Sequence, residues 1–271
     1  MSTDSTIVGV VGLGYVGLPL CLSMVEAGYD VVGIDIDDER IETLRSGESY
    51  VTEIPDERVA EAVKEGFRPT TDHTDLAAAA GISICVPTPL RKTGAPDMSY
   101  VSAAVEDIAA VASSDTTVIV ESTVYPGATQ EIVQPAFEDQ GFEIGEDIFL
   151  AFSPERINPG NEEYPPRKIP KVLGGVTDNC GDHAEALYSA VFDTIVRVDS
   201  AIEAELVKLL ENTFRAVNIG LINELAQIAE ELDVDIWSAI DAASTKPFGF
   251  MPFYPGPGLG GHCIPVDPTF L

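Results

Sequence analysis

The sequence predicts an α/β protein in which a doubly wound, mostly parallel sheet is followed by a domain built on one long helix. Short apolar, β-branched runs alternate with helix-like segments over the first two thirds of the chain. This alternation is typical of a parallel sheet with helices on both faces. From about residue 200 the pattern changes to one helical segment, 200–232. We therefore expect two domains, 1–199 and 200–271.

The individual elements follow from local signals. A first helix is expected to end at Gly28, because glycine is favoured just past a helix C-terminus. A second is expected at 98–111 with Asp97 as its N-cap, a third near 182–191, and a last one after Asp233. The expected strands are apolar runs bounded by Gly, Pro or Asp, namely 7–11, 30–34, 82–86, 117–120, 148–152, 171–173 and 194–198.

The composition excludes several classes of function. The 271 residues include 45 Asp and Glu against 15 Lys and Arg, a formal net charge of −30. Nucleic acids and anionic membrane surfaces require a cationic surface, so neither is an expected partner. The hydrophobic fraction, 45%, is too high for a disordered acidic chain. The acids are spread along the whole chain, which indicates a surface adapted to a salt-rich cytoplasm, where salt screens their repulsion. An acidic protein without such an adaptation is the alternative.

An uncharged stretch at 7–25 has the length of a membrane span, but it contains four Gly and one Pro. A signal peptide would need a basic segment before it, and none is present. The protein is therefore expected to be cytoplasmic, with its cysteines present as thiols. Cys21 and Cys85 fall in an expected helix and strand, as core residues do, whereas Cys180 is expected in a turn.

A G-x-G-x-x-G motif follows the first strand and opens the first helix. In that context it is typical of a dinucleotide site in a Rossmann-like fold. Gly12 permits the tight turn, and Gly14 lets a pyrophosphate approach the backbone. Gly17 lets the helix pack closely on the strand. The helix N-terminus supplies N–H donors for the phosphates even in so acidic a protein.

The second strand ends at Asp35, 18 residues after Gly17. Its carboxylate is expected to accept hydrogen bonds from ribose hydroxyls and to repel a 2′-phosphate, so NAD is the expected cofactor rather than NADP. Arg40 has two interpretations. It either contacts the ribose or forms an ion pair with Asp37 or Asp38.

Cys263 lies in the Gly- and Pro-rich segment 256–268, GPGLGGHCIPVDP. The glycines allow a ligand to approach the backbone, and Asp267-Pro268 is typical of an N-cap and first residue of a helix. A thiol near a helix N-terminus ionises more readily, although a buried structural cysteine is the alternative. No metal is expected, because the candidate ligands lack paired zinc-site spacings. Those candidates are Cys180, His183, His262 and Cys263.

On the long helix, Lys208, Asn212 and Arg215 are spaced i, i+4 and i+7, so they share one face. In so acidic a protein, this stripe is expected to face an anion or a reacting oxygen, with a solvated stripe as the alternative. A second face is apolar and is expected to form a homodimer through 200–232. Its residues are Ile219, Leu221, Ile222, Leu225 and Ile228.

Together these motifs resemble the nucleotide-sugar 6-dehydrogenases, the UDP-glucose/GDP-mannose dehydrogenase family, over essentially the whole chain. SPERINPG, IPKVLGG and FGFMPFYPGPG resemble the UDP-N-acetylglucosamine 6-dehydrogenases in particular. The motifs that carry the family resemblance are VVGLGYVGLPL (10–20), VPTPL (86–90), ESTVYPG (121–127), SPERINPG (153–160), IPKVLGG (169–175), ELVKLLENTFRAVNI (205–219) and GPGLGGHCIPVDP (256–268).

The resemblance implies that two NAD oxidise the C6 hydroxyl of a UDP-sugar to a carboxylate, through a thiohemiacetal and a thioester on Cys263. UDP-N-acetylglucosamine is the implied substrate, with UDP-N-acetylmannosamine and UDP-glucose as alternatives. Family members continue into a third, UDP-binding domain, and this chain ends four residues after Asp267. That domain is therefore expected to be absent, and an inactive NAD-binding or dimerisation module is a further alternative. A simple thiol-dependent aldehyde dehydrogenase is a third reading.

The resemblance also implies a role for each matching residue. Lys208, with Asn212 beside it, would act as acid/base or stabilise the developing oxyanion. Asp267 would assist the lysine or the water, and Thr123 would position the water. Pro159 stands where UDP-glucose enzymes have a second loop glutamate, so the residue that activates the water stays open. The implied catalytic residues are Cys263, Lys208, Asn212, Asp267, Thr123 and Glu155. The implied cofactor contacts are Gly12, Gly14, Tyr15, Val16, Gly17, Asp35, Arg40, Thr88 and Thr123. The implied substrate contacts are Glu155, Arg156, Ile157, Lys208, Asn212, Arg215 and Gly260.

Overall fold

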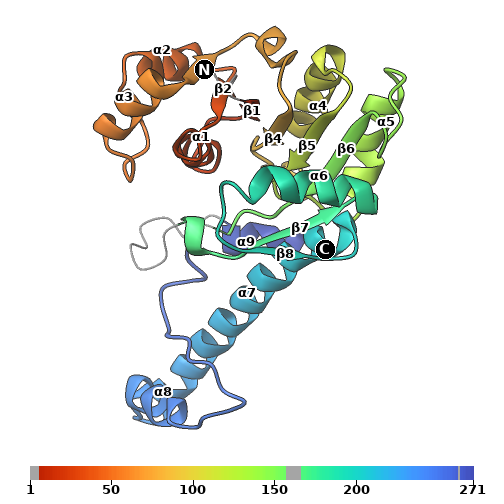
Figure 1. The fold of residues 1–271 in the computed structure, drawn as a ribbon. Coiled ribbons are helices and arrows are strands. Elements are labelled where there is room, and N and C mark those ends of the chain that lie inside the picture. Colours follow the sequence, from red (N-terminus) through yellow and green to blue (C-terminus); the bar gives the residue numbers. More distant parts are fainter. Residues whose placement is uncertain (1–5, 157–165, 262) are drawn as a thin grey trace. The chain divides into compact units, whose positions relative to one another are not determined.

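A computed structural model describes residues 6–156, 166–261 and 263–271. The chain divides into two compact units, residues 1–208 and 209–271. Within the described residues, unit 1 contains an eight-stranded sheet in the order β3-β2-β1-β4-β5-β6-β7-β8 (Figure 1). Neighbouring strands are parallel except β6 and β7, which are antiparallel. The predicted fold class, a doubly wound and mostly parallel sheet followed by a long helix, is confirmed.

The described elements have these bounds. The strands are β1 (Ile7–Val11), β2 (Asp30–Ile34), β3 (Phe67–Thr70), β4 (Gly81–Ile84), β5 (Thr116–Val120), β6 (Ile148–Phe152), β7 (Lys171–Gly175) and β8 (Ile195–Arg197). The α-helices are α1 (Gly17–Glu26), α2 (Asp38–Arg45), α3 (Asp56–Glu65), α4 (Ser99–Val111), α5 (Gln134–Glu138), α6 (Asp178–Tyr188), α7 (Ala201–Glu231), α8 (Ile236–Ser244) and α9 (Cys263–Val266). The shorter helical segments are η1 (His73–Leu76), η2 (Thr129–Val133, a π-helix), η3 (Pro166–Lys168) and η4 (Asp267–Phe270).

The order of the strands places a crevice beside β1. The chain runs outward from β1 through β2 to β3 and then returns to β4 on the other side of β1. The connections on the two sides therefore leave the sheet in opposite directions at the carboxyl ends of β1 and β4. In open parallel sheets, ligands bind at such a reversal. The glycine-rich turn follows β1, so the topology places it at this point.

Both faces of the sheet are buried, and the alternation of side chains along the strands assigns residues to them. Val8 and Val10 of β1 pack in one core cluster with side chains of α1, α2, α3 and α6. Val11 packs in a second cluster with side chains of α4 and α5. Because both faces are buried, the strand sequences are continuous apolar runs. This explains why most of the strands could be predicted from the sequence.

Several local predictions were wrong. Met98, not Asp97, is the N-cap of α4, although the Asp97 carboxylate still accepts the Ser99 N–H at 3.1 Å. Asp267 is the first residue of η4 and its N-cap is Val266. Cys180 lies inside α6, where it is fully buried, and not in a turn. Cys21 and Cys85 are buried, as predicted.

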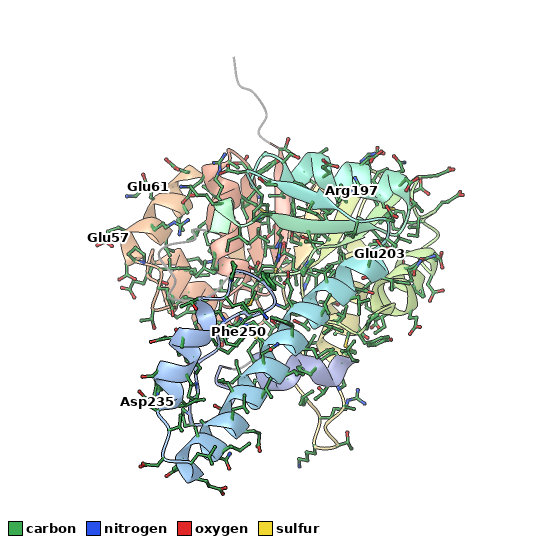
Figure 2. All side chains as sticks on the ribbon, turned by 90° about the horizontal axis from the view of Figure 1, so that it is seen from below. Glu57, Glu61, Arg197, Glu203, Asp235 and Phe250 are labelled. Atoms are coloured by element: carbon green, nitrogen blue, oxygen red, sulfur yellow. The ribbon has the colours of Figure 1, made fainter. Side chains whose placement is uncertain are left out.

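The acidic residues form much of the surface. Glu57 and Glu61 lie one turn apart on α3, are exposed, and project outward from the ribbon (Figure 2). Like charges at this spacing repel one another across the helix surface. Among the helices that the structure describes, none combines the length and the apolar character that crossing a bilayer requires.

Candidate functional site

The glycine-rich turn between β1 and α1 is shaped by close backbone contacts. Gly12 has φ +94°, and a Cβ there would lie 2.6 Å from the carbonyl oxygen of Cys85, just past β4. A Cβ on Gly17 would lie 1.8 Å from the carbonyl oxygen of Gly12. A Cβ on Gly14, in contrast, would meet no atom within 4 Å. Two glycines therefore close the turn, and the third leaves open space beside the backbone.

Asp35 connects this turn to the end of β2. It is buried, and its Oδ2 accepts the Leu13 N–H at 2.9 Å while its Oδ1 accepts the Asp37 N–H at 3.0 Å. The Arg40 guanidinium lies 3.3 Å from Asp35 Oδ2 and 3.5 Å from Asp37 Oδ2. Of the acids proposed as its ion-pair partners, Arg40 thus contacts Asp37, and it reaches Asp35 as well. Its guanidinium also lies 5.4 Å from the centre of the Tyr50 ring.

A cavity of about 440 Å³ opens beside Asp35. Its volume falls within the range of ligand pockets, and its walls combine apolar surface with a few charged groups, as cofactor sites do. The open space at Gly14 and the acceptor and cation beside the cavity fit a dinucleotide. The lining residues are Val11, Gly12, Ile34, Asp35, Ile36, Asp37, Arg40, His73, Val86, Pro87, Tyr100, Ala103, Ala104 and Asp107.

The other predicted cofactor contacts lie on loops at the same edge of the sheet. Tyr15 is 63% exposed in the glycine-rich turn, and Val16 is the N-cap of α1. Thr88 and Thr123 are half-buried in the loops that follow β4 and β5. Ser122 ties these two loops together, because its hydroxyl donates to the carbonyls of Val86 at 2.7 Å and Ile84 at 3.2 Å.

A second cluster lies at the described end of the loop after β6. The Glu155 carboxylate lies 3.3 Å from Lys171 Nζ, and Lys208 Nζ donates to the Glu155 carbonyl oxygen at 2.5 Å. The Arg156 guanidinium donates to the Pro170 carbonyl oxygen at 2.7 Å. The structure thus brings together Glu155 and Lys208, two predicted catalytic residues of unit 1. The predicted substrate contact Ile157, like Pro159, lies outside the described residues.

Lys171 is not among the residues that the sequence predicts to be functional, nor is Glu121, whose carboxylate lies 2.8 Å from Lys171 Nζ. Both side chains are buried. Lysine is almost never fully buried without a partner, so a lysine at the head of the apolar run KVLGG was a signal that a carboxylate lay nearby.

Unit 2 carries the predicted cysteine. Cys263 is exposed and is the first residue of α9, one turn before Asp267. Asp267 is buried and its Oδ2 accepts a hydrogen bond from the Asn212 amide, which is also buried. Gly260, three residues before the cysteine, has φ +73°. The structure therefore joins Asn212 and Asp267, and places Cys263 at the surface rather than in the alternative structural, buried role.

The remaining predicted residues of α7 differ in exposure. Arg215 is exposed, one turn beyond Asn212. On the predicted apolar face, Leu221, Leu225 and Ile228 are exposed, but Ile222 is buried within the chain. Of the candidate metal ligands, His183 stacks on Phe149 with ring centroids 3.4 Å apart, and His262 lies outside the described residues.

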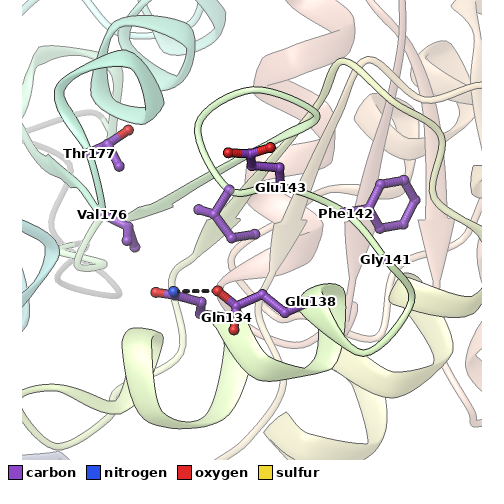
Figure 3. A pocket seen from close by; sticks show the side chains of 8 residues that line it. Gln134, Glu138, Gly141, Phe142, Glu143, Val176 and Thr177 are labelled. Carbon is purple, nitrogen blue, oxygen red and sulfur yellow. Dashed lines mark hydrogen bonds between the residues drawn. The ribbon is translucent and has the colours of Figure 1, made fainter.

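A further hollow, of about 450 Å³, lies between α5 and the start of α6 (Figure 3). Glu143 and Phe142 line it, and on its α5 wall Gln134 donates to Glu138, one turn along the helix, at 2.7 Å. Its described lining includes none of the residues that the sequence predicts to be functional. The cavity at Asp35, and not this one, is therefore the candidate cofactor site.

The prediction for Asp35 follows from its two contacts. In Asp35→Asn, the amide oxygen can still accept the Leu13 N–H, but the negative charge is lost. We expect NAD to bind about tenfold more weakly and the preference over NADP to narrow, because one charge-assisted hydrogen bond contributes about 1.5–3 kcal/mol. Calorimetric titration with both cofactors measures this. Asp38→Asn is the control, because Asp38 is exposed and is not part of the cavity wall. An Asp35→Asn variant that prefers NAD over NADP as strongly as Asp38→Asn does would contradict the prediction.

Comparison with known proteins accounts for this architecture. Residues 6–192 match the model of the NAD binding domain of the UDP-glucose/GDP-mannose dehydrogenase family, and residues 202–271 match that of its central domain. The chain is 42% identical to a UDP-N-acetyl-D-glucosamine 6-dehydrogenase of Pseudomonas aeruginosa, over 97% of this chain and 62% of that protein. It is 38% identical to a UDP-N-acetyl-D-mannosamine dehydrogenase of Pyrococcus horikoshii, over 97% of this chain and 63% of that protein.

Solved structures agree. The UDP-D-ManNAc dehydrogenase of Pyrococcus horikoshii superposes with a TM-score of 0.91, covering 98% of this chain and 64% of that one. A UDP-glucose dehydrogenase of Pyrobaculum islandicum, 28% identical, gives a TM-score of 0.87 and covers 99% of this chain and 63% of that one. The chain thus spans less than two thirds of the length of these relatives. The predicted cofactor, NAD, is confirmed by the match to the NAD binding domain. The chain belongs to the UDP-glucose/GDP-mannose dehydrogenase family.

Proposed function

We propose that the protein oxidises the C6 hydroxyl of a UDP-sugar to a carboxylate, and that the sugar is N-acetylglucosamine. Family membership and the cavity beside Asp35 support oxidation with NAD. The 42% identity to a UDP-N-acetyl-D-glucosamine 6-dehydrogenase supports the choice of sugar, although relatives named for N-acetylmannosamine are nearly as similar. The observation that carries the proposal is the exposed thiol of Cys263 beside a Gly-rich turn, one turn before the buried Asn212–Asp267 pair.

The reaction needs two oxidations at one carbon. NAD, when bound, supplies the hydride acceptor. Between the two hydride transfers, the Cys263 thiolate forms an S–C bond to the C6 aldehyde, and the carbonyl electron pair moves to oxygen. Loss of the second hydride gives a thioester, and water then cleaves the S–C bond and releases the acid and the thiol. Lys208, held on the Glu155 carbonyl, is the proposed cation for the developing oxyanion.

Product stoichiometry tests the proposal. The protein, expressed from its complete reading frame, is incubated with NAD and with each of the three UDP-sugars. We expect two NADH for each uronic acid formed, with UDP-N-acetylglucosamine as the best substrate. A higher kcat/KM for UDP-N-acetylmannosamine or UDP-glucose would replace the sugar and keep the reaction. NAD binding without turnover of any of the three UDP-sugars would refute the proposed activity and favour an NAD-binding module.

We also propose that the protein is a homodimer through α7. An apolar stripe at helical spacing runs along the part of α7 in unit 2 and is exposed. Its residues are Phe214, Val217, Leu221, Leu225 and Ile228. The variant Leu221→Glu/Leu225→Glu places two charges in this stripe and should convert the dimer into a monomer, while NAD still binds. Sedimentation at micromolar concentration measures the oligomeric state. Glu230→Gln, on an exposed residue of the opposite face of α7, is the control and should stay dimeric. A wild-type monomer, or a double variant that stays dimeric, would contradict the proposal.

We further propose that the protein works in a salt-rich cytoplasm. At about 0.1 M salt the Debye length is about 10 Å, so surface acids such as Glu57 and Glu61 repel one another. At about 1 M salt the Debye length is about 3 Å, and this repulsion is largely screened. We expect the Tm to rise continuously as KCl is raised over this range, measured by calorimetry. Glu57→Lys/Glu61→Lys is the matched comparison and should show a smaller rise. A Tm that is flat or falls with KCl would contradict the proposal.

A further inference from the structure

Four polar side chains meet under α6 in the otherwise apolar core of unit 1. The alternation of the strands explains how: Ser83 of β4, Glu121 just after β5 and Lys171 at the start of β7 all face the same side of the sheet as the core cluster that contains Tyr188 of α6. All four residues are buried, and none is more than 3% exposed as a whole residue. The cluster is therefore part of the interior and not of a solvated surface.

Hydrogen bonds connect these groups in a chain. Ser83 Oγ lies 2.8 Å from the Tyr188 hydroxyl, which donates to Glu121 Oε1 at 2.5 Å. Lys171 Nζ donates to the other carboxylate oxygen, Glu121 Oε2, at 2.8 Å. The ammonium also lies 5.1 Å from the centre of the Phe192 ring, within the range of a cation–π contact. Lys171 is thus held from several sides.

The ammonium has a second carboxylate partner. Glu155 Oε2 lies 3.3 Å from Lys171 Nζ, and the Glu155 side chain is 13% exposed, against 4% for that of Lys171. Glu155 is therefore the point at which the buried chain of contacts approaches the surface. Its main chain is fixed as well, because Lys208 Nζ donates to its carbonyl oxygen at 2.5 Å.

The number of charges is informative. One carboxylate suffices to neutralise a buried ammonium, and burying a further charge opposes folding. Burial alone would lower the pKa of Lys171, but Glu121 and Glu155 together raise it above its ordinary value, so the lysine stays charged. Stability by itself accounts for the Lys171–Glu121 pair. It does not account for the use of the same ammonium to hold Glu155.

We propose that Lys171 is a positioning residue that fixes the Glu155 carboxylate for the reaction, and that Glu121, Tyr188 and Ser83 hold Lys171 in place for this purpose. The inference rests on the proposed function, in which Glu155 belongs to the catalytic and substrate site. Lys171 itself need not touch the sugar or the cofactor. Its contribution is to reduce the number of rotamers open to Glu155, so that the carboxylate meets the substrate in one orientation.

The test is a double-mutant cycle between Lys171 and Glu155 in the protein expressed from its complete reading frame. Lys171→Met alone would leave Glu121 buried and unpaired, so the variant is Lys171→Met/Glu121→Gln, which removes both buried charges and keeps an acceptor for Tyr188. We expect this variant to lower kcat at least tenfold with UDP-N-acetylglucosamine, or the best substrate, while the KM for NAD stays within twofold. In a Glu155→Gln background, Lys171→Met/Glu121→Gln should lower kcat less than twofold. With Glu155 present, arginine in place of methionine, in Lys171→Arg/Glu121→Gln, should restore part of the lost kcat.

The matched control is Glu205→Gln. Glu205 is another buried acid of unit 1, and it accepts hydrogen bonds from Gly127 and Thr129 rather than from the Lys171 cluster. Its effect should combine additively with Glu155→Gln. Additive effects of the Lys171 and Glu155 changes, or no rescue by arginine in a folded variant, would overturn the positioning role and leave the proposed function standing. A wild-type protein that oxidises no UDP-sugar would overturn both.

Discussion

Replacing Gly17 with alanine lowers the Tm of the protein by about 6–12 °C or more. A Cβ at this position lies 1.8 Å from the Gly12 carbonyl oxygen, which is backbone and cannot rotate away. Either α1 moves away from β1 or the turn opens. Overpacking a side chain costs about 1–3 kcal/mol, and a clash with backbone is expected at or above the upper end of that range. For a chain of this size each kcal/mol corresponds to about 2–4 °C. Calorimetry of the purified chain measures the shift.

Gly14→Ala is the matched variant, because the same methyl group meets no protein atom there. We expect its Tm to stay close to that of the wild type while NAD binds at least tenfold more weakly, since the methyl group fills space that the pyrophosphate needs. The pair separates closing the turn from binding the ligand. Equal Tm values for Gly17→Ala and the wild type, or unchanged NAD affinity in Gly14→Ala, would show that the turn does not work as described.

If the proposed function holds, we expect Cys263→Ser to lower kcat for formation of the sugar acid by about 10³-fold or more. A serine hydroxyl ionises far less readily than a thiol, so it is a much weaker nucleophile. Removing the nucleophile of other covalent enzymes lowers kcat by a factor of this size or larger. The measurement is acid produced over time by the protein expressed from its complete reading frame. Acid formation at the wild-type rate would exclude a covalent role for Cys263.

The cysteines of the chain provide an internal control. Cys21, Cys85 and Cys180 are buried, whereas Cys263 is exposed. Burial in the core raises the pKa of the Cys85 thiol well above its ordinary value, so the thiolate that alkylates is not available there. Iodoacetamide should therefore label the native protein once, at Cys263, and inactivate it in step with labelling. Inactivation that precedes labelling of Cys263 would point to another group.

The parts of the fold with the strongest local signals were predictable. The strands Ile7–Val11, Asp30–Ile34 and Ile148–Phe152 were predicted with their observed bounds, because strands buried on both faces are unbroken apolar runs. The edge strand β3, with the sequence FRPT, was missed: it is short, contains a proline and is defined only by its pairing with β2. The antiparallel direction of β7 was also not predicted, since an apolar run carries no direction.

The site was predictable where a motif is contiguous and not where contacts join distant segments. The turn from Gly12 to Gly17 is one local structure, so its glycines could be interpreted in advance. The Lys171–Glu121 contact joins residues 50 positions apart, and the Lys208–Glu155 contact joins residues 53 apart. Only the paired strands and α7 bring them together. Likewise, Asn212 and Asp267 were each predicted, but their mutual hydrogen bond required the folded unit.

The double role of Asp35 restricts how this protein can evolve. The Asp35 carboxylate lines the cofactor cavity and also accepts the Leu13 N–H through Oδ2, so one side chain serves both ligand choice and local folding. A lineage that drifts toward NADP cannot simply exchange this acid for glycine or alanine, because the buried Leu13 N–H would lose its acceptor. Such a residue requires a second substitution that supplies another acceptor, whereas asparagine would keep one. The preference for NAD is therefore maintained by the hydrogen bond that folds the glycine-rich turn as well as by contacts with the cofactor.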